Sequence, residues 1–227
     1  FKYLCATGIL FILLVEANSQ IKSNNKNAPD LFQFLDLVAL ATIADVAPMT
    51  GLNRAFVKQG LAIMAKRKNP GLRALCDVCK LSSPPSTYDL GFLLGPRINA
   101  GGRIGNSKLG IELLTSKTSA EAEGFANKLD ELNIDRRKIE AKALRKLEDQ
   151  IAERNSKSAL LWVAKEGWHP GVVGIIASRL KEKYNKPTVV FSIENGECSG
   201  SARSIKGINI GFGVSKLVSE NLITKGG

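Results

Sequence analysis

Apolar side chains recur at steps of three or four residues over long parts of the chain, whereas two short, dense apolar runs stand near its C-terminal end. The first pattern is typical of amphipathic or buried helices, and the second of buried strands. We therefore expect a mainly helical part before residue 156 and a small α/β arrangement after it.

The first 116 residues predict several helices joined by polar loops. Helices are expected over residues 2–18, 53–66, 71–79 and 107–114. Residues 4–15 are apolar, but the run is too short to span a bilayer, so we expect a buried helix of an α/β core and no membrane segment. Residues 21–30 and the glycine-rich residues 95–105 are expected to be loops.

The longest periodic pattern covers residues 119–155. Its apolar positions are Phe125, Leu129, Leu132, Ile139, Ala143, Leu147 and Ile151. This spacing predicts one long amphipathic helix, which we interpret as a rigid connector.

A different pattern follows residue 155. Strands are expected over 159–164 and 188–193 with a helix over 172–184 between them, and Asn195-Gly196 predicts a hairpin into a returning strand over 198–205. A strand–helix–strand unit favours parallel pairing of the first two strands. The predicted fold class is α/β, with parts at residues 1–116, 117–155 and 156–227.

The charge is strongly positive and unevenly spread. Lys and Arg number 32 against 21 acidic residues, a formal net charge of +11. The excess lies in residues 1–116 and 156–227, because residues 117–155 are neutral. A positive surface favours a polyanionic partner such as nucleic acid, although a merely basic protein without such a partner also fits.

The four cysteines are Cys5, Cys76, Cys79 and Cys198. Cys76 and Cys79 have the spacing of half a zinc site, but no second pair exists. They also close a helical segment instead of opening one, as a redox pair would. We expect reduced thiols in a cytoplasmic protein.

Candidate chemistry begins in residues 95–105, GPRINAGGRIG. Arg97, Asn99 and Arg103 stand among glycines there, and arginine presents a fork of donors that suits phosphate. The pattern fits an anion-binding loop, but a surface turn with solvated arginines has the same composition.

Asp45 ends the apolar run of residues 35–46. A carboxylate at the end of a buried segment is costly unless a partner satisfies it. A helix cap, an ion pair and a metal ion each remain possible partners.

Two further candidates lie after residue 156. His169 precedes Pro170-Gly171 at a predicted helix start, where backbone N–H groups attract anions. Ser201 and Arg203 lie near a strand end and could hold a phosphate. A packed histidine and an exposed edge arginine are the structural alternatives.

The order of these motifs resembles the RecJ-type single-stranded-DNA exonucleases of the DHH phosphoesterase superfamily. The motifs are the Asp45 segment, GPRINAGGRIG, the long helix, GWHPGVVGIIASRL, GSARS and the final Gly226-Gly227. The resemblance covers essentially the whole chain. It implies the C-terminal part of a DHH catalytic domain, the connecting helix and a DHH-associated domain.

The resemblance also implies roles for single residues. It makes Asp45 a ligand of catalytic Mn²⁺ or Mg²⁺, and it puts Arg97, Asn99 and Arg103 near the active site. His169, Ser201 and Arg203 are implied to bind the DNA phosphate, and Gly226 and Gly227 look like the opening of a Gly-Gly-His motif with the same role.

The implied activity is metal-dependent 5′–3′ hydrolysis of single-stranded DNA in repair and recombination. The family's other metal motifs find no match and are expected before residue 1, so residues 1–227 alone are expected to be inactive. Repair and recombination proteins are possible partners, and a monomer is expected. The alternatives are a phosphodiesterase acting on short oligonucleotides or cyclic dinucleotides, and a non-catalytic relative that binds single-stranded DNA.

Overall fold

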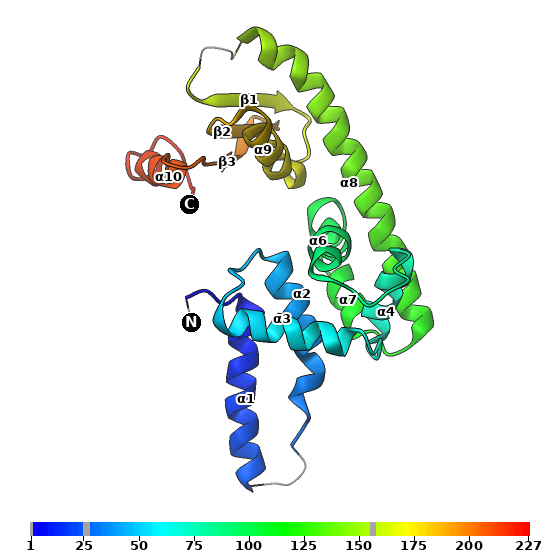
Figure 1. Ribbon diagram of the computed structural model, residues 1–227. Helices are drawn as coiled ribbons and strands as arrows, with labels where there is room; N and C mark the ends of the chain where they lie inside the picture. The colour runs from blue at the N-terminus through cyan, green and yellow to red at the C-terminus, as the bar shows by residue number, and fades with distance from the viewer. Residues whose placement is uncertain (1, 25–27, 155–157) are drawn as a thin grey trace. The chain divides into compact units, whose positions relative to one another are not determined.

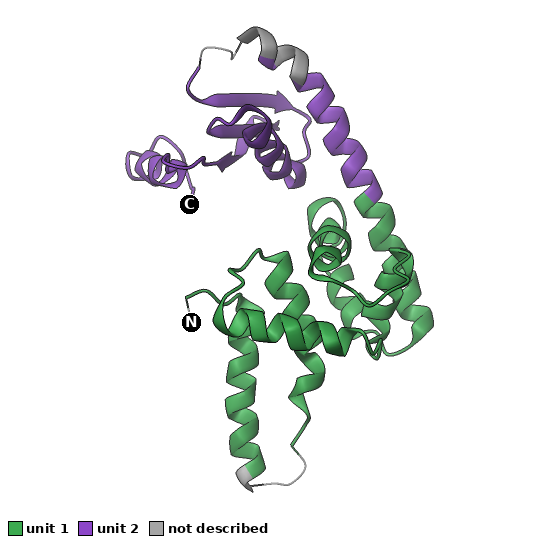
Figure 2. Cartoon of the chain, in the orientation of Figure 1, with its two compact units in different colours: residues 1–133 green, residues 134–227 purple. Residues whose placement is uncertain are grey.

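A computed structural model describes residues 2–24, 28–154 and 158–227, which divide into two compact units (Figures 1 and 2). Unit 1 is residues 1–133, and its described part is helical. Unit 2 is residues 134–227 and holds a three-stranded sheet. The predicted α/β class, with a long helix that precedes a smaller α/β domain, is confirmed.

The long helix α8 (Ser119–Arg154) crosses the boundary between the units, as the change of colour in Figure 2 shows. Each half of α8 packs within its own unit, so the helix belongs to both units as well as connecting them. The three-part division at residues 116 and 155 stays a prediction, and its second boundary lies outside the described residues.

Unit 1 is built from short helices around the first half of α8. The elements before α8 are α1 (Ala6–Asn24), η1 (Leu31–Phe34), α2 (Leu35–Ala44), α3 (Gly51–Met64), α4 (Pro70–Val78), α5 (Thr87–Asp89), η2 (Leu90–Leu94), α6 (Gly95–Ile104) and α7 (Leu109–Thr115). The main core gathers fully buried side chains from several of these helices and from α8, among them Leu75, Leu90, Leu94, Leu113 and Leu129. This apolar burial is the main stabilising term of the unit.

The expectation for the first helix was wrong in two respects. α1 begins four residues later than predicted and continues to Asn24, so part of the expected loop at 21–30 is helical. Apolar side chains of α1 are also exposed in this chain, Leu13 at 62 % and Leu10 at 54 %. Only part of the helix packs in unit 1, with Phe11 edge-on to Phe56 at 5.4 Å between ring centroids. Hydrophobicity showed that the segment is a helix but could not show what covers it.

Residues 95–104 form a helix, α6, and not the expected loop. Pro96 is at its first turn, a position that suits proline because that N–H has no partner inside the helix. The glycines permit close helix packing. A Cβ at Gly101 would be 3.1 Å from the Leu129 side chain, and one at Gly105 would be 2.6 Å from that of Leu132. The many glycines of residues 95–105 suggested a flexible loop, but in the structure they allow this segment to pack closely against α8.

Unit 2 follows the predicted strand order. Its elements after α8 are β1 (Leu161–Glu166), α9 (Pro170–Tyr184), β2 (Thr188–Glu194), β3 (Glu197–Arg203) and α10 (Ile210–Ser219). β1 pairs parallel with β2, and β2 pairs antiparallel with β3, as expected. Asn195 and Gly196 both have positive φ, 52° and 79°, which is the geometry of the predicted tight hairpin.

A buried ionic cluster fastens α9 to α8 in unit 2. Glu140 accepts hydrogen bonds from Arg136 at 3.2 Å and from Arg179 of α9 at 3.3 Å. The side chains of Glu140 and Arg136 are only 11 % and 12 % exposed. Arg179 itself is 61 % exposed, so Arg136 is the buried partner of Glu140, and Arg179 adds a solvent-screened link from α9 to α8.

None of the helices in the described ranges has the length and apolar character needed to cross a membrane.

The close packing of α3 on α2 predicts the effect of adding one methyl group. Gly60 of α3 lies against α2, and a Cβ there would be 2.2 Å from the Leu35 carbonyl oxygen and 2.5 Å from the Ala39 Cβ. Helix propensity alone would make alanine more stable than glycine at this position by about 1 kcal/mol. The overlap of the added methyl group with the α2 backbone costs more than that gain, so the substitution is destabilising. We expect Gly60→Ala to lower the free energy of unfolding by about 1–3 kcal/mol in urea titrations.

The matched control is Gly124→Ala on α8, where nothing lies within 4 Å of an added Cβ. That change should be neutral or stabilising. A Gly60→Ala protein as stable as the Gly124→Ala protein would show that α2 and α3 do not pack this closely.

Candidate functional site

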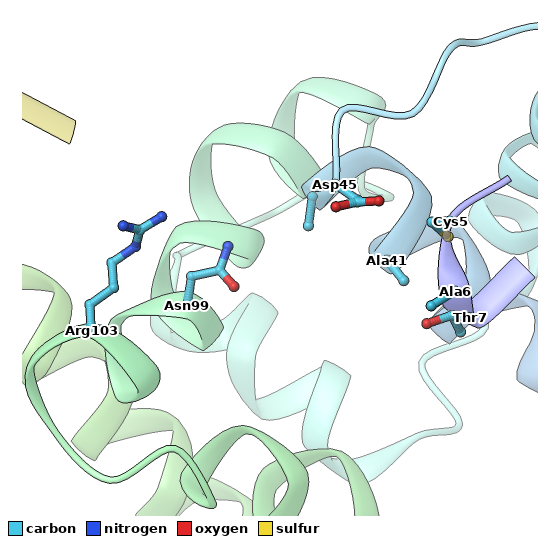
Figure 3. Close-up of a pocket in the computed structure, with 8 residues that line it drawn as sticks. Cys5, Ala6, Thr7, Ala41, Asp45, Asn99 and Arg103 are labelled. Carbon is cyan, nitrogen blue, oxygen red and sulfur yellow. The ribbon is translucent and has the colours of Figure 1, made fainter. Parts of the chain in front are cut away.

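Unit 1 contains a cavity of about 580 Å³ that collects three of the predicted site residues. We call it the Asp45 cavity, and it is lined by Cys5, Ala6, Thr7, Ala41, Ala44, Asp45, Asn99 and Arg103. In Figure 3, Asn99 and Arg103 project from α6 on one side, while Asp45, Cys5 and Thr7 lie on the other. The cavity is therefore formed by three segments that lie far apart in the sequence: residues 5–7, the end of α2 and α6.

Asp45 is the residue that ends α2. Its N–H donates to the Ala41 carbonyl at 2.9 Å, and Val46 then turns the chain away with φ 55°. Contrary to the expectation of a buried carboxylate, Asp45 is exposed. The buried carboxylate of α2 is Asp36, whose pKa is raised by loss of solvent, although the Leu37 N–H partly offsets this.

Close packing of α6 on the end of α2 brings Asn99 and Arg103 to Asp45. A Cβ on Gly95 would be 3.3 Å from the Ala44 Cβ, so the missing side chain lets α6 approach the residue just before Asp45. The preceding turn, η2, is π-helical, a local widening often found at functional sites. Asn99 and Arg103 are four residues apart, so both lie on one face of α6.

Arg97, the fourth residue expected in this cluster, does not line the cavity. Its Nε donates to Asp130 of α8 at 2.8 Å and its Nη1 to the Leu93 carbonyl at 2.8 Å. Its side chain is 15 % exposed. In this conformation Arg97 ties α6 to α8, and a direct role in catalysis stays a prediction.

Asn53, which no sequence pattern singles out, joins the two segments that carry Cys5 and Asp45 on one wall of the cavity. Asn53 of α3 is fully buried, and its Nδ2 donates to the carbonyls of Tyr3 at 2.8 Å and Pro48 at 2.9 Å. These carbonyls lie two residues before Cys5 and three after Asp45. The only signal in the sequence was an amide at an apolar face of a helix, which does not reveal its partners.

Asp45 is the one carboxylate that lines the cavity. Across the described ranges, no group of three or more His, Cys, Asp or Glu side chains is arranged to hold a metal ion. Hard divalent cations take about six oxygen ligands, so Asp45 fits as one ligand of such an ion but is not a metal site by itself.

In unit 2, the predicted phosphate-binding residues occupy two neighbouring elements. His169 caps α9, where its Nδ1 accepts the Gly171 N–H at 3.1 Å, and its side chain is exposed. Arg203 was expected near a strand end and is the last residue of β3, which stops two residues before the predicted end at 205; it donates from Nη1 to Ser201 Oγ at 2.9 Å. Gly226 follows α10 and lies close to it, because a Cβ added at Gly226 would be 2.5 Å from the Val214 side chain. Binding of phosphate by these residues and Gly227 stays a prediction.

Comparison with known proteins agrees with this architecture. Residues 155–227 match the DHHA1 domain. The single-stranded-DNA-specific exonuclease RecJ of Dickeya dadantii is 38 % identical over 95 % of this chain, and that of Escherichia coli is 36 % identical over the same share. The chain belongs to the RecJ family.

Solved RecJ structures share the fold. RecJ from Thermus thermophilus, crystallised with Mn²⁺, superposes with a TM-score of 0.82 and 33 % identity over 97 % of this chain. A manganese-bound exonuclease RecJ gives 0.80 and 31 % over 99 %. The RecJ-type chain described here spans about 40 % of the length of the Dickeya and Escherichia proteins, and 32 % and 54 % of the two crystallised chains.

The cysteines of this RecJ-type chain are free thiols, as expected. Burial raises the pKa of both Cys76 and Cys79 to about 11, with nearby Arg67 and Arg97 respectively opposing the shift. At pH 8 only about one such thiol in a thousand is ionised, so neither is a ready metal ligand or nucleophile.

We therefore expect one fast-reacting cysteine in thiol labelling at pH 8. Cys198 is exposed, whereas Cys5 and Cys76 are 5 % and 2 % exposed. Cys198→Ser should remove the fast phase, and full labelling should require denaturant. Rapid modification of Cys76 and Cys79, or their protection by added zinc, would contradict this interpretation.

Proposed function

We propose that this chain is the nucleic-acid-facing part of a metal-dependent exonuclease that releases nucleotides from single-stranded DNA in the 5′–3′ direction. The observation that carries the proposal is the Asp45 cavity, which joins one carboxylate, one amide and one guanidinium from separated segments. The family relationship supports it, because the related RecJ proteins are named as single-stranded-DNA-specific exonucleases.

Each residue of the cavity has a role suited to its chemistry. Asp45 offers an exposed carboxylate for a divalent ion such as Mn²⁺ or Mg²⁺, which in nucleases activates water and stabilises the leaving oxygen. Arg103 and Asn99 supply donors for phosphate oxygens on the opposite wall. Asn53 and the Arg97–Asp130 pair hold the two walls in place.

Unit 2 adds a second contact to the DNA backbone in this proposal. Arg203, Ser201 and His169 belong to a region with an excess of basic over acidic side chains. Contacts of this kind bind phosphate without selecting sequence, which suits an enzyme that digests any strand.

We also propose that the protein works in the cytoplasm, that it takes part in DNA repair and recombination with other proteins of those pathways, and that it is a monomer. These points rest on the family resemblance alone.

Loss of the Asp45 carboxylate should separate cleavage from binding. In the complete protein that carries these residues, we expect Asp45→Asn to lower manganese-dependent nucleotide release by at least about tenfold, as loss of metal-site groups commonly does. Affinity for single-stranded DNA should be retained. Release would be followed at limiting Mn²⁺ on a labelled strand.

Glu123→Gln is the control, because Glu123 is an exposed carboxylate of α8 outside the cavity. Normal release by Asp45→Asn at limiting Mn²⁺ would remove Asp45 from the metal site. Binding without release by the complete wild-type protein would instead favour the non-catalytic alternative.

Replacement of Arg203 should weaken binding alike for all sequences. We expect Arg203→Ala to lower the affinity of residues 1–227 for single-stranded DNA and to make its salt dependence shallower by about one counterion. A fluorescence anisotropy titration against salt, with two unrelated sequences, measures both.

Arg137→Ala is the matched control, because it removes the same charge from an exposed position on α8. Equal effects of the two substitutions would mean that only net charge matters. An unchanged affinity and slope for Arg203→Ala would leave Arg203 a structural residue of β3.

A further inference from the structure

The guanidinium of Arg203 is held by three hydrogen bonds within unit 2. Nη1 donates to Ser201 Oγ at 2.9 Å and to the Ala202 carbonyl at 2.8 Å, and Nε donates to Ser178 Oγ at 2.9 Å. Ser201 and Ala202 belong to β3, as Arg203 does, whereas Ser178 belongs to α9. The side chain therefore bridges the end of the sheet and the helix that packs on it.

Ser178 is suited to receive this bond because its own proton is already used. Its hydroxyl donates to the Gly174 carbonyl at 3.1 Å, one helical turn earlier, so a lone pair of its oxygen is directed to Arg203 Nε. Gly174 and Ser178 are four residues apart and share one face of α9.

Gly174 provides the space in which the rest of the guanidinium lies. A Cβ there would be 3.0 Å from Arg203 Nη2 and 3.2 Å from Ser201 Oγ, both closer than ordinary contacts. In the described part of the chain, Nη2 donates no hydrogen bond to protein. The arrangement uses Nε and Nη1 internally and leaves Nη2 for an external acceptor.

We propose that Gly174 and Ser178 are positioning residues that hold the Arg203 guanidinium in one orientation, with Nη2 presented to a phosphate oxygen of the DNA backbone. This inference rests on the proposed role of Arg203 in binding DNA. Holding an arginine in place removes the entropy loss that a mobile side chain suffers on binding.

A purely structural role of the two residues predicts a different result. If Gly174 and Ser178 only pack α9 on β3, their replacement changes the stability of unit 2 and not the salt dependence of DNA binding. If they position Arg203, the affinity and its salt dependence change while the fold is retained. Gly174→Ala separates the two strongly, since alanine favours the helix while its methyl group displaces Nη2.

The test uses residues 1–227 and a single-stranded oligonucleotide, with anisotropy titrations at several salt concentrations and urea unfolding of each variant. We expect Ser178→Ala and Gly174→Ala each to weaken binding about three- to tenfold, which corresponds to the net contribution of one ordinary hydrogen bond. Both should make the salt slope shallower. Ser178→Thr keeps the hydroxyl and should bind as the wild type does, because threonine can make the same bond to the carbonyl one turn earlier.

Two controls match the substitutions in type. Ser219 of α10 also donates to a backbone carbonyl, that of Lys216 at 2.8 Å, but within the described ranges it forms no hydrogen bond with an arginine. Gly213 of α10 has nothing within 4 Å of an added Cβ. Ser219→Ala and Gly213→Ala should leave affinity and salt slope unchanged.

Double variants decide between the outcomes. In an Arg203→Ala background, Ser178→Ala and Gly174→Ala should cause no further loss of affinity, because both act through Arg203. Further weakening there would overturn the inference, as would wild-type binding by both single variants when Arg203→Ala binds weakly. Unchanged binding by Arg203→Ala itself would refute the proposed DNA contact instead.

Discussion

The Asp45 cavity depends on the close packing of α6 between the end of α2 and the first half of α8. Gly95 lets α6 lie against Ala44, and the Arg97–Asp130 ion pair ties the same helix to α8. Asn99 and Arg103 then line the same cavity as the carboxylate that ends α2. A side chain at position 95 would push α6 away from α2 and so separate the two walls of the cavity, because closely packed helices leave no space for an added methyl group.

Glycines also permit close contacts in unit 2. Gly174 leaves room beside α9 for the Arg203 guanidinium, and Gly200 leaves room on β3 where a Cβ would be 2.5 Å from the Phe191 ring. In unit 1 the missing Cβ of Gly95 lets two helices approach, and in unit 2 the missing Cβ of Gly174 leaves room for a polar side chain. Polar chemistry is thereby placed on packed secondary structure, where its geometry is well defined.

Burial divides the polar residues of the chain into those that join packed helices and those that line the Asp45 cavity. Glu140 and the Arg97–Asp130 pair are mostly buried and join helices. Asp45 and Asn99 are exposed and line a cavity. Arginine and aspartate occur in both groups, since Arg103 also lines the cavity, so composition alone could not distinguish an arginine that joins helices from one that lines the cavity.

The sequence by itself determined most of the longer helices, the strand order, the hairpin at Asn195-Gly196 and the family, because these follow from local periodicity, turn chemistry and motif order. It could not show that residues 95–104 are helical, since glycine lowers helix propensity and only contact with α8 compensates for that. Nor could it show that Arg97 pairs with Asp130, 33 residues away. Such pairings are decided by which surfaces meet once the helices pack, and no local pattern encodes them.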